Sequence, residues 1–493
     1  MNLIDEISES LSSKKNRRIL WGLLLIFFGS LIYICLCSDE KADALSTMLN
    51  ILQALLMIVT LGYLLIHTNK KESLRYKNNP FFYLERYQDE IKRFLVIKKT
   101  NELRFYSTLL NEELDCIEKI KISKGDRSLI YHELKTQLQS YLLSNSVLEY
   151  APVKKTLISD LEFLKLDSNY NLPWFIANLG HDLLVKKFNI SEKFDYNGTT
   201  LSLNKFKQEP EGKLIFEFSK SFYYNYLVTN MMPEFKVMQN ATVRDLLEPN
   251  KRLNRLEDSL AENHLGLSAL IVTKDNFLII PQRTANTTVF KGQLSPSVSG
   301  AANILTCSGD DGKISAKNWF IQELKEELSD IFSSEDIKNN LDINKVEFIG
   351  MSREIKRLGK PEIFFFCKLS NVTGEQLLKH KLVHNLFGDS IKSNEKLNQG
   401  STFIDEHENE KYFIANIDKF IESIDVSLDL KKLWNQDCEV DYCVTVSEPQ
   451  SRKVSLVDRL TRRESSKKMI LSESLLVNCI FYLKHMKKVE LIG

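Results

Sequence analysis

The sequence predicts an α/β domain preceded by an all-α connector and a two-helix transmembrane hairpin. Three observations lead to this fold class. Two runs without charged residues lie near the N-terminus, at residues 19–37 and 45–66. Through the region 70–190, apolar residues then recur with the spacing of amphipathic helices. Between residues 200 and 445, short runs rich in β-branched and aromatic residues are interrupted by a charged helix, which is typical of an α/β domain.

The bulk composition sets limits on function. The chain has 493 residues, 27% of them charged, and a net charge of +1. This length allows two or three domains, and the balanced charge gives no reason to expect binding to a nucleic-acid polymer. The eight cysteines show neither C-x-x-C spacing nor the density of a disulfide framework. We therefore expect reduced thiols in a cytosolic setting, and no zinc site.

The N-terminal region is predicted to enter a membrane. The first run, ILWGLLLIFFGSLIYICLC, has about the length that a helix needs to cross a hydrocarbon core of ~30 Å. Only the short linker SDEKADA separates it from the second run, so the two helices are expected to be antiparallel. Basic residues flank the pair on both sides, which places both flanks in the cytoplasm. The sequence therefore predicts a cytoplasmic tail at residues 1–18 and a hairpin at residues 19–67, with the lipid bilayer as partner.

Two features of this region have alternative interpretations. Ala42-Asp43-Ala44 is similar to the cleavage site of a signal peptide, but the first apolar run is too long and a second one follows at once. Asn50 and Gln53 lie three residues apart on one helix face. They would either promote association into a homo-oligomer or pair within a single hairpin.

The segments on either side of the α/β domain are predicted to be helical. The runs FFYLERYQDEIKRFLVIKK, ELRFYSTLLNEELDCIEKIK and SLIYHELKTQLQSYLLS make the region 70–190 a connector or small bundle. Residues 446–493 end in an amphipathic helix with basic ends. That helix either packs onto the body of the protein or contacts a membrane surface.

The stretch QELKEELSD gathers three carboxylates. Glu323, Glu326 and Glu327 stand at i, i+3 and i+4, on one face of the predicted helix. Like charges one turn apart destabilise a helix unless a cation relieves them. Mg²⁺ or Mn²⁺ would do so, since these cations prefer carboxylate oxygens and bridge them to substrate phosphates. The alternative is a solvated helix face without a ligand.

The order of motifs resembles that of a Nudix hydrolase domain. LIVTKDNFLIIPQR is followed by GQLSPSVSGAAN, by the helix AKNWFIQELKEELSDI and by VEFIGMSREIKRLGKPEIFFF. In that family, a glycine loop leads into a helix whose arginine and glutamates hold divalent metal on a diphosphate. The resemblance covers about half of the chain and implies an α/β/α sandwich with a mixed sheet. It also implies Glu323, Glu326 and Glu327 as ligands of Mg²⁺ or Mn²⁺.

The sequence departs from the family pattern at three places. Gln322 stands where the family has its arginine, and Ser329-Asp330 replaces the glycine after the paired glutamates. The insertion ILTCSGDDGK separates Gly300 from the helix, so that Ile314 takes the place of the early loop glutamate. These departures put turnover in doubt while leaving every carboxylate of the run in place.

The resemblance suggests further site residues. Arg283, at the end of FLIIPQR, is expected near the substrate or in a surface salt bridge, and Gly300 is expected to allow a close turn. Glu354 would be a base or a metal ligand, or would pair with a neighbouring arginine. Arg353 and Lys360 would bind a phosphate, or belong to a solvated basic loop.

The implied function is hydrolysis of a nucleoside diphosphate linked to another group, such as a dinucleotide. Water would attack phosphorus, with Glu323 or Glu354 as general base. Together with the hairpin, the domain resembles membrane-anchored Nudix effectors of bacterial cyclic-oligonucleotide (CBASS) anti-phage systems. That resemblance implies the bacterial inner membrane as the location and a cyclic oligonucleotide as activator.

Two alternatives to this function stay open. In the first, the domain is an inactive nucleotide sensor that triggers membrane disruption through the hairpin. In the second, it is a housekeeping hydrolase without a defence role.

Overall fold

The computed structural model describes most of the chain after residue 82. The chain divides into two units, Met1–Lys77 and Asn78–Gly493, and the described residues all belong to the second. They are residues 83, 86–99, 103–106, 141–180, 197–238, 241–284, 292–309, 311–387, 409–428, 442–446 and 469–492.

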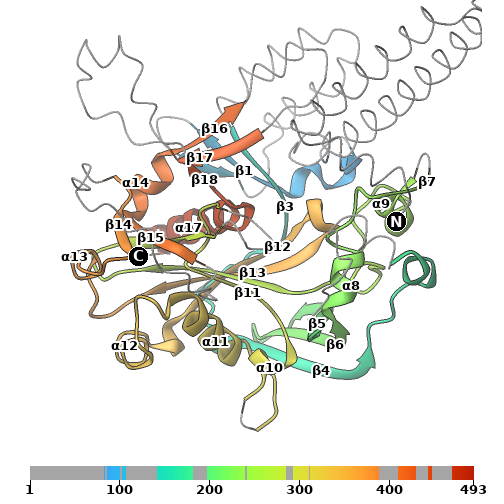
Figure 1. Ribbon diagram of the computed structural model, residues 1–493, viewed down its shortest axis with the longest axis horizontal. Coiled ribbons are helices and arrows are strands. Elements are labelled where there is room, and N and C mark those ends of the chain that lie inside the picture. The colour runs from blue at the N-terminus through green and yellow to red at the C-terminus, as the bar shows by residue number, and fades with distance from the viewer. Residues whose placement is uncertain are drawn as a thin grey trace, which may run out of the picture. The chain divides into compact units, whose positions relative to one another are not determined.

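A mixed sheet of ten strands organises this unit (Figure 1). Most neighbouring strands are antiparallel, but β13 runs parallel to β9 and β14 parallel to β15. In spatial order the strands are β14 (Val383–Asn385), β15 (Asn409–Asn416), β10 (Phe277–Arg283), β9 (Gly266–Val272), β13 (Lys360–Lys368), β12 (Glu347–Glu354), β3 (Tyr141–Tyr150), β1 (Phe94–Lys99) and β2 (Leu103–Tyr106). The short strand β11 (Val298–Ala301) pairs with β9 off this path.

The central strand β9 is buried on both faces. Every residue of its sequence GLSALIV is buried. Successive side chains of a strand point to opposite faces, and β9 divides accordingly. Leu267, Ala269 and Ile271 join one apolar cluster, and Leu270 and Val272 join the other. The sheet is therefore covered by a layer on each side.

On one face the sheet is covered by α11 (Ala316–Leu328). Ser315 caps this helix by accepting a hydrogen bond from the Asn318 amide, and Phe320 packs edge-on against Phe365 of β13. A second sheet, β4 (Leu161–Asn169), β6 (Leu214–Phe222) and β5 (Thr199–Gln208), adds Phe163 and Phe216 to the same cluster.

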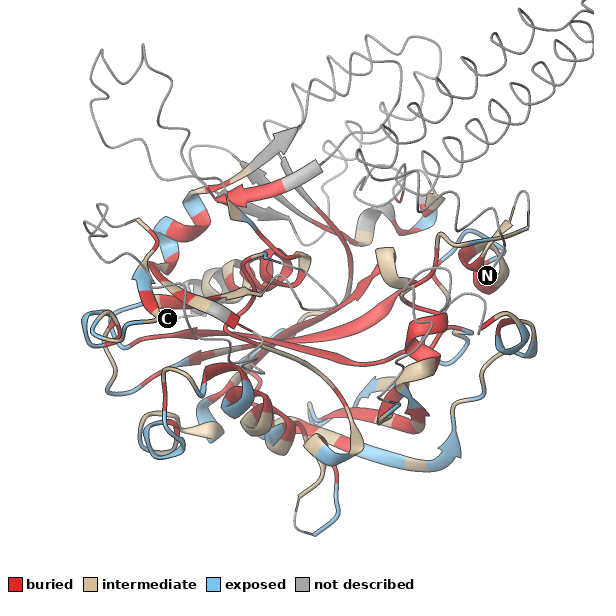
Figure 2. Cartoon of the chain, in the orientation of Figure 1, coloured by how far each residue is buried: buried red, intermediate tan, exposed pale blue. Residues whose placement is uncertain are grey.

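The opposite face is covered by α17 (Glu473–Ile492). Phe481 of this helix stacks on Phe364 with ring centroids 4.9 Å apart, and it fills the space beside Gly350. Figure 2 shows the buried residues following the central sheet and α17, whereas α12 is largely exposed.

The remaining elements are short. A third sheet contains β16 (Ile424–Leu428), β17 (Tyr442–Val446) and β18 (Met469–Ile470), and β7 (Lys236–Met238) pairs with β8 (Ala241–Thr242). The other helices are α8 (Tyr223–Val228), α9 (Val243–Leu247), α10 (Ile304–Cys307), α12 (Ser334–Asn340), α13 (Gly374–Leu377) and α14 (Ile417–Glu422). The 3-10 helices are η1 (Gln88–Arg93), η2 (Ile158–Asp160), η3 (Ile343–Lys345) and η4 (Ile355–Arg357).

The predicted fold class is wrong in its N-terminal parts. The region 70–190 was expected to be all-α, yet it contains β1, β2, β3 and β4. The apolar residues of β3 satisfied a helical spacing in the sequence. In the fold, however, β3 pairs with the edge of β12, and strand pairing outweighs the local helical preference.

The transmembrane hairpin is the second correction. In the described ranges, no helix combines the length and apolar character needed to cross a membrane. Residues 19–37 and 45–66, on which that prediction depended, lie outside the described residues.

Candidate functional site

The glutamates of α11 do not share one environment. Glu323 and Glu327 are buried, with 7% and 5% of their surface exposed, whereas Glu326 is exposed. Residues four apart on a helix lie above one another, and the apolar side of α11 packs onto the sheet. The sheet-facing side therefore carries two carboxylates at the margin of its apolar contact.

Glu323 is held between a tryptophan and a strand backbone. Its Oε1 accepts a hydrogen bond from the indole Nε1 of Trp319, one turn earlier, at 2.9 Å. The carboxylate also lies directly against Gly300 of β11, where a Cβ would overlap Cδ and both oxygens of Glu323. Glycine is thus required at this point of β11 because the Glu323 carboxylate occupies the place of a side chain.

Glu327 receives donors from three separate strands. Arg283 Nη1 lies 3.4 Å and Ser299 Oγ 3.3 Å from its Oε1, and Asn409 Nδ2 donates to its Oε2 at 2.8 Å. Tyr412 donates from its hydroxyl to the backbone carbonyl of Glu327 at 2.7 Å. The carboxyl end of α11 is thereby fixed to β10, β11 and β15.

Glu326 is turned away from this pair. It accepts a hydrogen bond from Gln322 Nε2 at 2.5 Å on the exposed side of the helix. Across the described part of the chain, no group of three or more His, Cys, Asp or Glu side chains is arranged to hold a metal ion. The three glutamates expected as ligands are therefore divided into a buried pair and one exposed carboxylate.

Glu323 and Glu327 are the two carboxylates of α11 that could hold a divalent cation together. Two carboxylates one turn apart repel each other, and hard cations such as Mg²⁺ or Mn²⁺ relieve such repulsion with oxygen ligands. Arg283 is farther from Glu327 than the usual 2.7–2.9 Å of a charge-assisted hydrogen bond. Glu323 and Glu327 would hold the cation next to Gly300, where the missing side chain keeps the strand backbone close.

Four of the predicted site residues come together, and three others lie elsewhere. Arg283, Gly300, Glu323 and Glu327 form the group just described. Arg353 and Glu354 end β12, which is separated from β11 by β9 and β13, and Lys360 begins β13, which is separated from β11 by β9. A turn joins these two strand ends. For β12, three steps of roughly 4.8 Å between strands amount to about 14 Å.

Glu354 and Arg353 serve the turn itself. Glu354 is 2% exposed and lies 3.3 Å from Arg357 Nε. Arg353 donates from Nε to the Gly359 carbonyl at 2.8 Å and from Nη1 to the Asn254 carbonyl at 2.5 Å. Glu354 thus pairs with a neighbouring arginine, which is the alternative that the sequence left open for it. Arg353 fixes the backbone of the turn.

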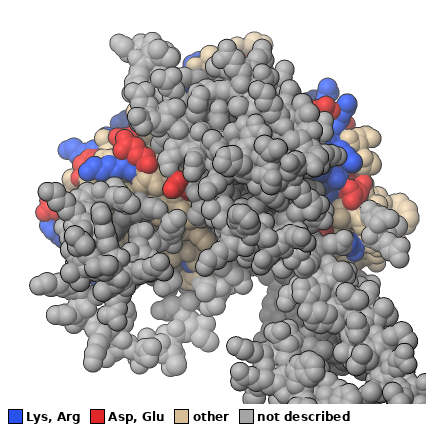
Figure 3. Space-filling model, turned by 90° about the horizontal axis from the view of Figure 1, so that it is seen from above, with Lys and Arg blue, Asp and Glu red and all other residues tan. Residues whose placement is uncertain are grey.

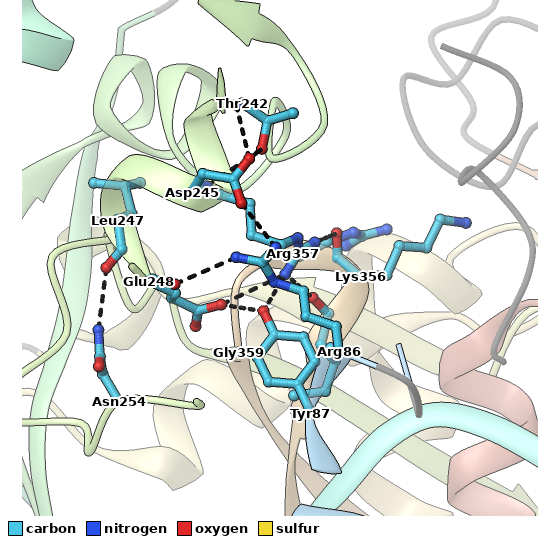
Figure 4. Close-up of polar contacts among 12 residues, drawn as sticks. Arg86, Tyr87, Thr242, Asp245, Leu247, Glu248, Asn254, Lys356, Arg357 and Gly359 are labelled. Atoms are coloured by element: carbon cyan, nitrogen blue, oxygen red, sulfur yellow. Dashed lines mark hydrogen bonds and ion pairs between the residues drawn. The ribbon is translucent and has the colours of Figure 1, made fainter. Parts of the chain in front are cut away.

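The same turn is fixed from a second side by Arg244 of α9, which is fully buried. Its Nη1 donates to the Ile355 carbonyl at 2.9 Å and to the Tyr87 hydroxyl at 2.6 Å, and its Nε pairs with Glu234 at 2.7 Å. Figure 4 shows Arg86 and Tyr87, which precede η1, reaching Asp245 and Glu248. The segment before β1 is thus fastened to the turn after β12.

Burial shifts the pKa of several groups near this turn. Burial raises the pKa of Glu262 to about 8, and the Thr200 hydroxyl and Lys360 oppose the shift. Burial lowers the pKa of His264 to about 3. Burial also lowers the pKa of Lys360, against the opposing effect of the nearby Glu362 carboxylate. At neutral pH, Glu262 is thus largely protonated and His264 is neutral.

Sequence reasoning missed four polar residues. Ser299 and Asn409 contact Glu327, while Ser268 donates to Glu362 on the opposite face of the sheet. Ser299 precedes Gly300, so its position beside a recognised residue was a usable signal. Asn409 comes from β15 and had no such signal, because 82 residues separate it from Glu327.

On the face drawn in Figure 3, described basic and acidic side chains lie next to one another at both margins. The described side chains of this face therefore form no patch of a single sign.

Comparisons with known proteins add little. No family model matches this sequence, and no curated protein matches it. Among solved structures, the chain is similar to DR0079 from Deinococcus radiodurans, with a TM-score of 0.16 and 20% identity. The match covers 22% of this chain and 57% of the DR0079 chain, little more than half of that protein. A similarity this low carries no argument about fold or activity.

Proposed function

We propose that this protein is a Nudix-type hydrolase that uses Mg²⁺ or Mn²⁺ to cleave a nucleoside diphosphate linked to another group. The observation that carries the proposal is the position of Glu323 against Gly300, with Glu327 one turn away. Two buried carboxylates beside a strand with no side chain leave the helix edge suited to a cation and a diphosphate oxygen.

In this proposal the chain's own residues have separate tasks. A bound cation would polarise a phosphoryl oxygen and lower the pKa of a coordinated water. Glu323 and Glu327 would hold that cation, and Arg283 would place a positive charge near the diphosphate. Glu323 takes a proton from the attacking water, and the water oxygen forms a bond to phosphorus. The bond between that phosphorus and the bridging oxygen breaks, and the bridging oxygen leaves with the second phosphate. Glu354 has no part in this step, since it lies three strands away and pairs with Arg357.

The test is a panel of nucleoside diphosphate-linked compounds with Mg²⁺ or Mn²⁺, scored for phosphorus-containing products. Glu323→Gln and Glu327→Gln are each expected to lower kcat/KM by at least 100-fold, about 2.7 kcal/mol of transition-state stabilisation. Glu335→Gln, an exposed glutamate of α12, is the matched control and should leave turnover unchanged. Equal turnover in all three variants would exclude the assigned site.

A second readout does not depend on turnover. Because Trp319 donates to Glu323, a cation bound by this carboxylate should change the fluorescence of the indole. Mn²⁺ is expected to alter this emission in the wild-type protein and in Glu335→Gln, but not in Glu323→Gln. Trp319→Phe should remove the signal and so identify its source.

One observation favours a second candidate, a nucleotide sensor without turnover. Gln322 replaces the family's arginine and hydrogen-bonds Glu326, which keeps the third carboxylate on the exposed side. In this case nucleotides, including a cyclic oligonucleotide activator, would bind without product formation. Binding by calorimetry with no product in the panel would select this candidate.

A further inference from the structure

Asn409, the first residue of β15, holds both the side chain and the backbone of Glu327. Its Nδ2 donates to Glu327 Oε2 at 2.8 Å and lies 3.3 Å from the Glu327 carbonyl oxygen. The side chain of Asn409 is 8% exposed, and its Oδ1 accepts no hydrogen bond from the described residues. An amide turned the other way would put this oxygen against Oε2, so the Glu327 carboxylate decides how the amide is oriented.

Arg283 stands directly opposite Asn409. The pairing of β10 with β15 shifts by one residue between Gln282 and Arg283, and this shift makes Asn409 the cross-strand partner of Arg283. Irregularities of this kind re-aim side chains. Cross-strand partners project from one face of a sheet, with Cβ atoms about 4.5–5.5 Å apart. Arg283 and Asn409 therefore approach the same carboxylate from neighbouring positions.

The two side chains contact different oxygens of Glu327. Asn409 binds Oε2 at 2.8 Å, whereas Arg283 Nη1 lies 3.4 Å from Oε1. A guanidinium and a carboxylate form their strongest contact as a bidentate pair, with two parallel bonds of about 2.7–2.9 Å. Glu327 would have to turn its carboxylate to form that pair, and turning would break its bond to Asn409. Asn409 thus keeps the contact with Arg283 long.

A bidentate pair between Arg283 and Glu327 would compete with a cation. It would neutralise the carboxylate that attracts Mg²⁺ or Mn²⁺, and it would also withdraw the guanidinium from a phosphate. The backbone of Glu327 is held separately, because Tyr412 donates to its carbonyl at 2.7 Å in the last turn of α11. What Asn409 adds is the orientation of the carboxylate.

We propose that Asn409 is a positioning residue that prevents Glu327 from closing onto Arg283. Oε1 of Glu327 can then exchange its long contact with Arg283 for a divalent cation, and Arg283 can turn to the diphosphate. This inference rests on the proposed function, because it takes Glu327 as a ligand of the cation. It adds a control of the same site, in which Arg283 competes with the cation and Asn409 sets the balance.

The test is a double-mutant cycle that measures the affinity of the full chain for Mn²⁺, with the free ion quantified by electron paramagnetic resonance. Asn409→Ala is expected to weaken Mn²⁺ binding at least tenfold. Adding Arg283→Met to this variant should raise the affinity at least tenfold, whereas Arg283→Met alone should raise it no more than threefold. Removal of a positive charge by itself would raise the affinity equally in both backgrounds, so the difference isolates the competition.

Asn416→Ala is the matched control, on the same strand. Asn416 caps α14 by accepting a hydrogen bond from the Lys419 amide, so its loss should lower stability without changing the affinity for Mn²⁺. Asn409→Ser is the second variant in case Asn409→Ala fails to fold. Its hydroxyl is too short to replace the amide on Oε2, so it should show the same dependence on Arg283.

Two results would overturn the positioning role. One is an unchanged affinity for Mn²⁺ in Asn409→Ala or Asn409→Ser. The other is a loss of the same size whether or not Arg283 is replaced, which is what a purely structural asparagine would give.

The two proposals can fail separately. If Mn²⁺ binds with the expected coupling between Asn409 and Arg283 but no compound is hydrolysed, the hydrolase proposal is wrong and the positioning role stands. If hydrolysis depends on Glu323 and Glu327 while the effects of Asn409→Ala and Arg283→Met are independent, the reverse holds. Equal Mn²⁺ binding in the wild-type protein and Glu327→Gln would overturn both.

Discussion

The carboxylate of Glu323, on α11, occupies the space that a side chain at Gly300, on β11, would need. The two residues are far apart in sequence because ILTCSGDDGK lies between them, yet helix and strand meet at this point. The contact joins the helix that carries the glutamates to the sheet. It leaves no space for a side chain at position 300, not even a methyl group.

Gly300→Ala should therefore displace Glu323 and lower activity. Overpacking at a buried contact costs about 1–3 kcal/mol of unfolding free energy, which urea denaturation would measure. We expect kcat/KM to fall at least tenfold, because the carboxylate can no longer rest against the strand. Full activity together with unchanged stability would show that the carboxylate and Gly300 are not in contact.

Arg244→Met should destabilise the protein severely. Arg244 is fully buried, pairs with Glu234 at 2.7 Å and lies 3.6 Å from the buried Glu248. Removing one partner of a buried charge network leaves the others uncompensated, at a cost of about 3–5 kcal/mol. Urea denaturation measures the loss. Arg252→Met is the matched control: its exposed pair with Asp89 should contribute less than about 1 kcal/mol.

Glu262→Gln should remove a dependence of stability on pH. The pKa of Glu262 is about 8 in the folded protein and 4.5 in the reference state, so between these values the folded state binds more protons than the unfolded state. Stability contributed by Glu262 is thus fully present below pH 4.5 and is lost as pH rises through 8, at up to about 1.4 kcal/mol per pH unit.

The difference between wild type and Glu262→Gln isolates this effect. Burial raises the pKa of Glu473 to about 7. Below that pH, this group changes stability with the same sign as Glu262, and it does so in both proteins. His264 contributes with the opposite sign between pH 3 and 6.5, because its folded pKa is lowered. Denaturation curves at pH 7 and pH 8 should therefore show a loss in wild type that is smaller in Glu262→Gln. Equal losses would mean that Glu262 is ionised in the folded state at both pH values.

Three thiols are expected to resist alkylation in the native protein. Cys307, Cys367 and Cys479 are buried and free, and burial raises the pKa of all three, for Cys367 and Cys479 to about 12. Only the thiolate reacts readily. Iodoacetamide followed by peptide mass mapping should leave these residues unmodified until denaturant is added. Rapid native modification of any of them would show that its environment opens in solution.

Much of the α/β region could be predicted from the sequence because its signals are local. Runs such as GLSALIV and EIFFFC predict buried strands, and these residues form β9 and part of β13. The same holds for the presence of α11, whose apolar residues recur at helical spacing. The prediction that the region 70–190 is all-α was wrong because the deciding contacts there are not local. Whether β3 is helix or strand depends on the free edge of β12, which lies about 200 residues later.

The sequence by itself determined the chemistry available to the site: glutamates at helical spacing on α11, a glycine before them and an arginine at the end of β10. Only the tertiary structure decided which of these residues meet. Packing of α11 on the sheet buries Glu323 and Glu327 and exposes Glu326, and strand order carries Glu354 away from Gly300. Spacing along a chain fixes the face of a helix or strand, but partners from β10, β11 and β15 come together through pairing and burial, which no local pattern encodes.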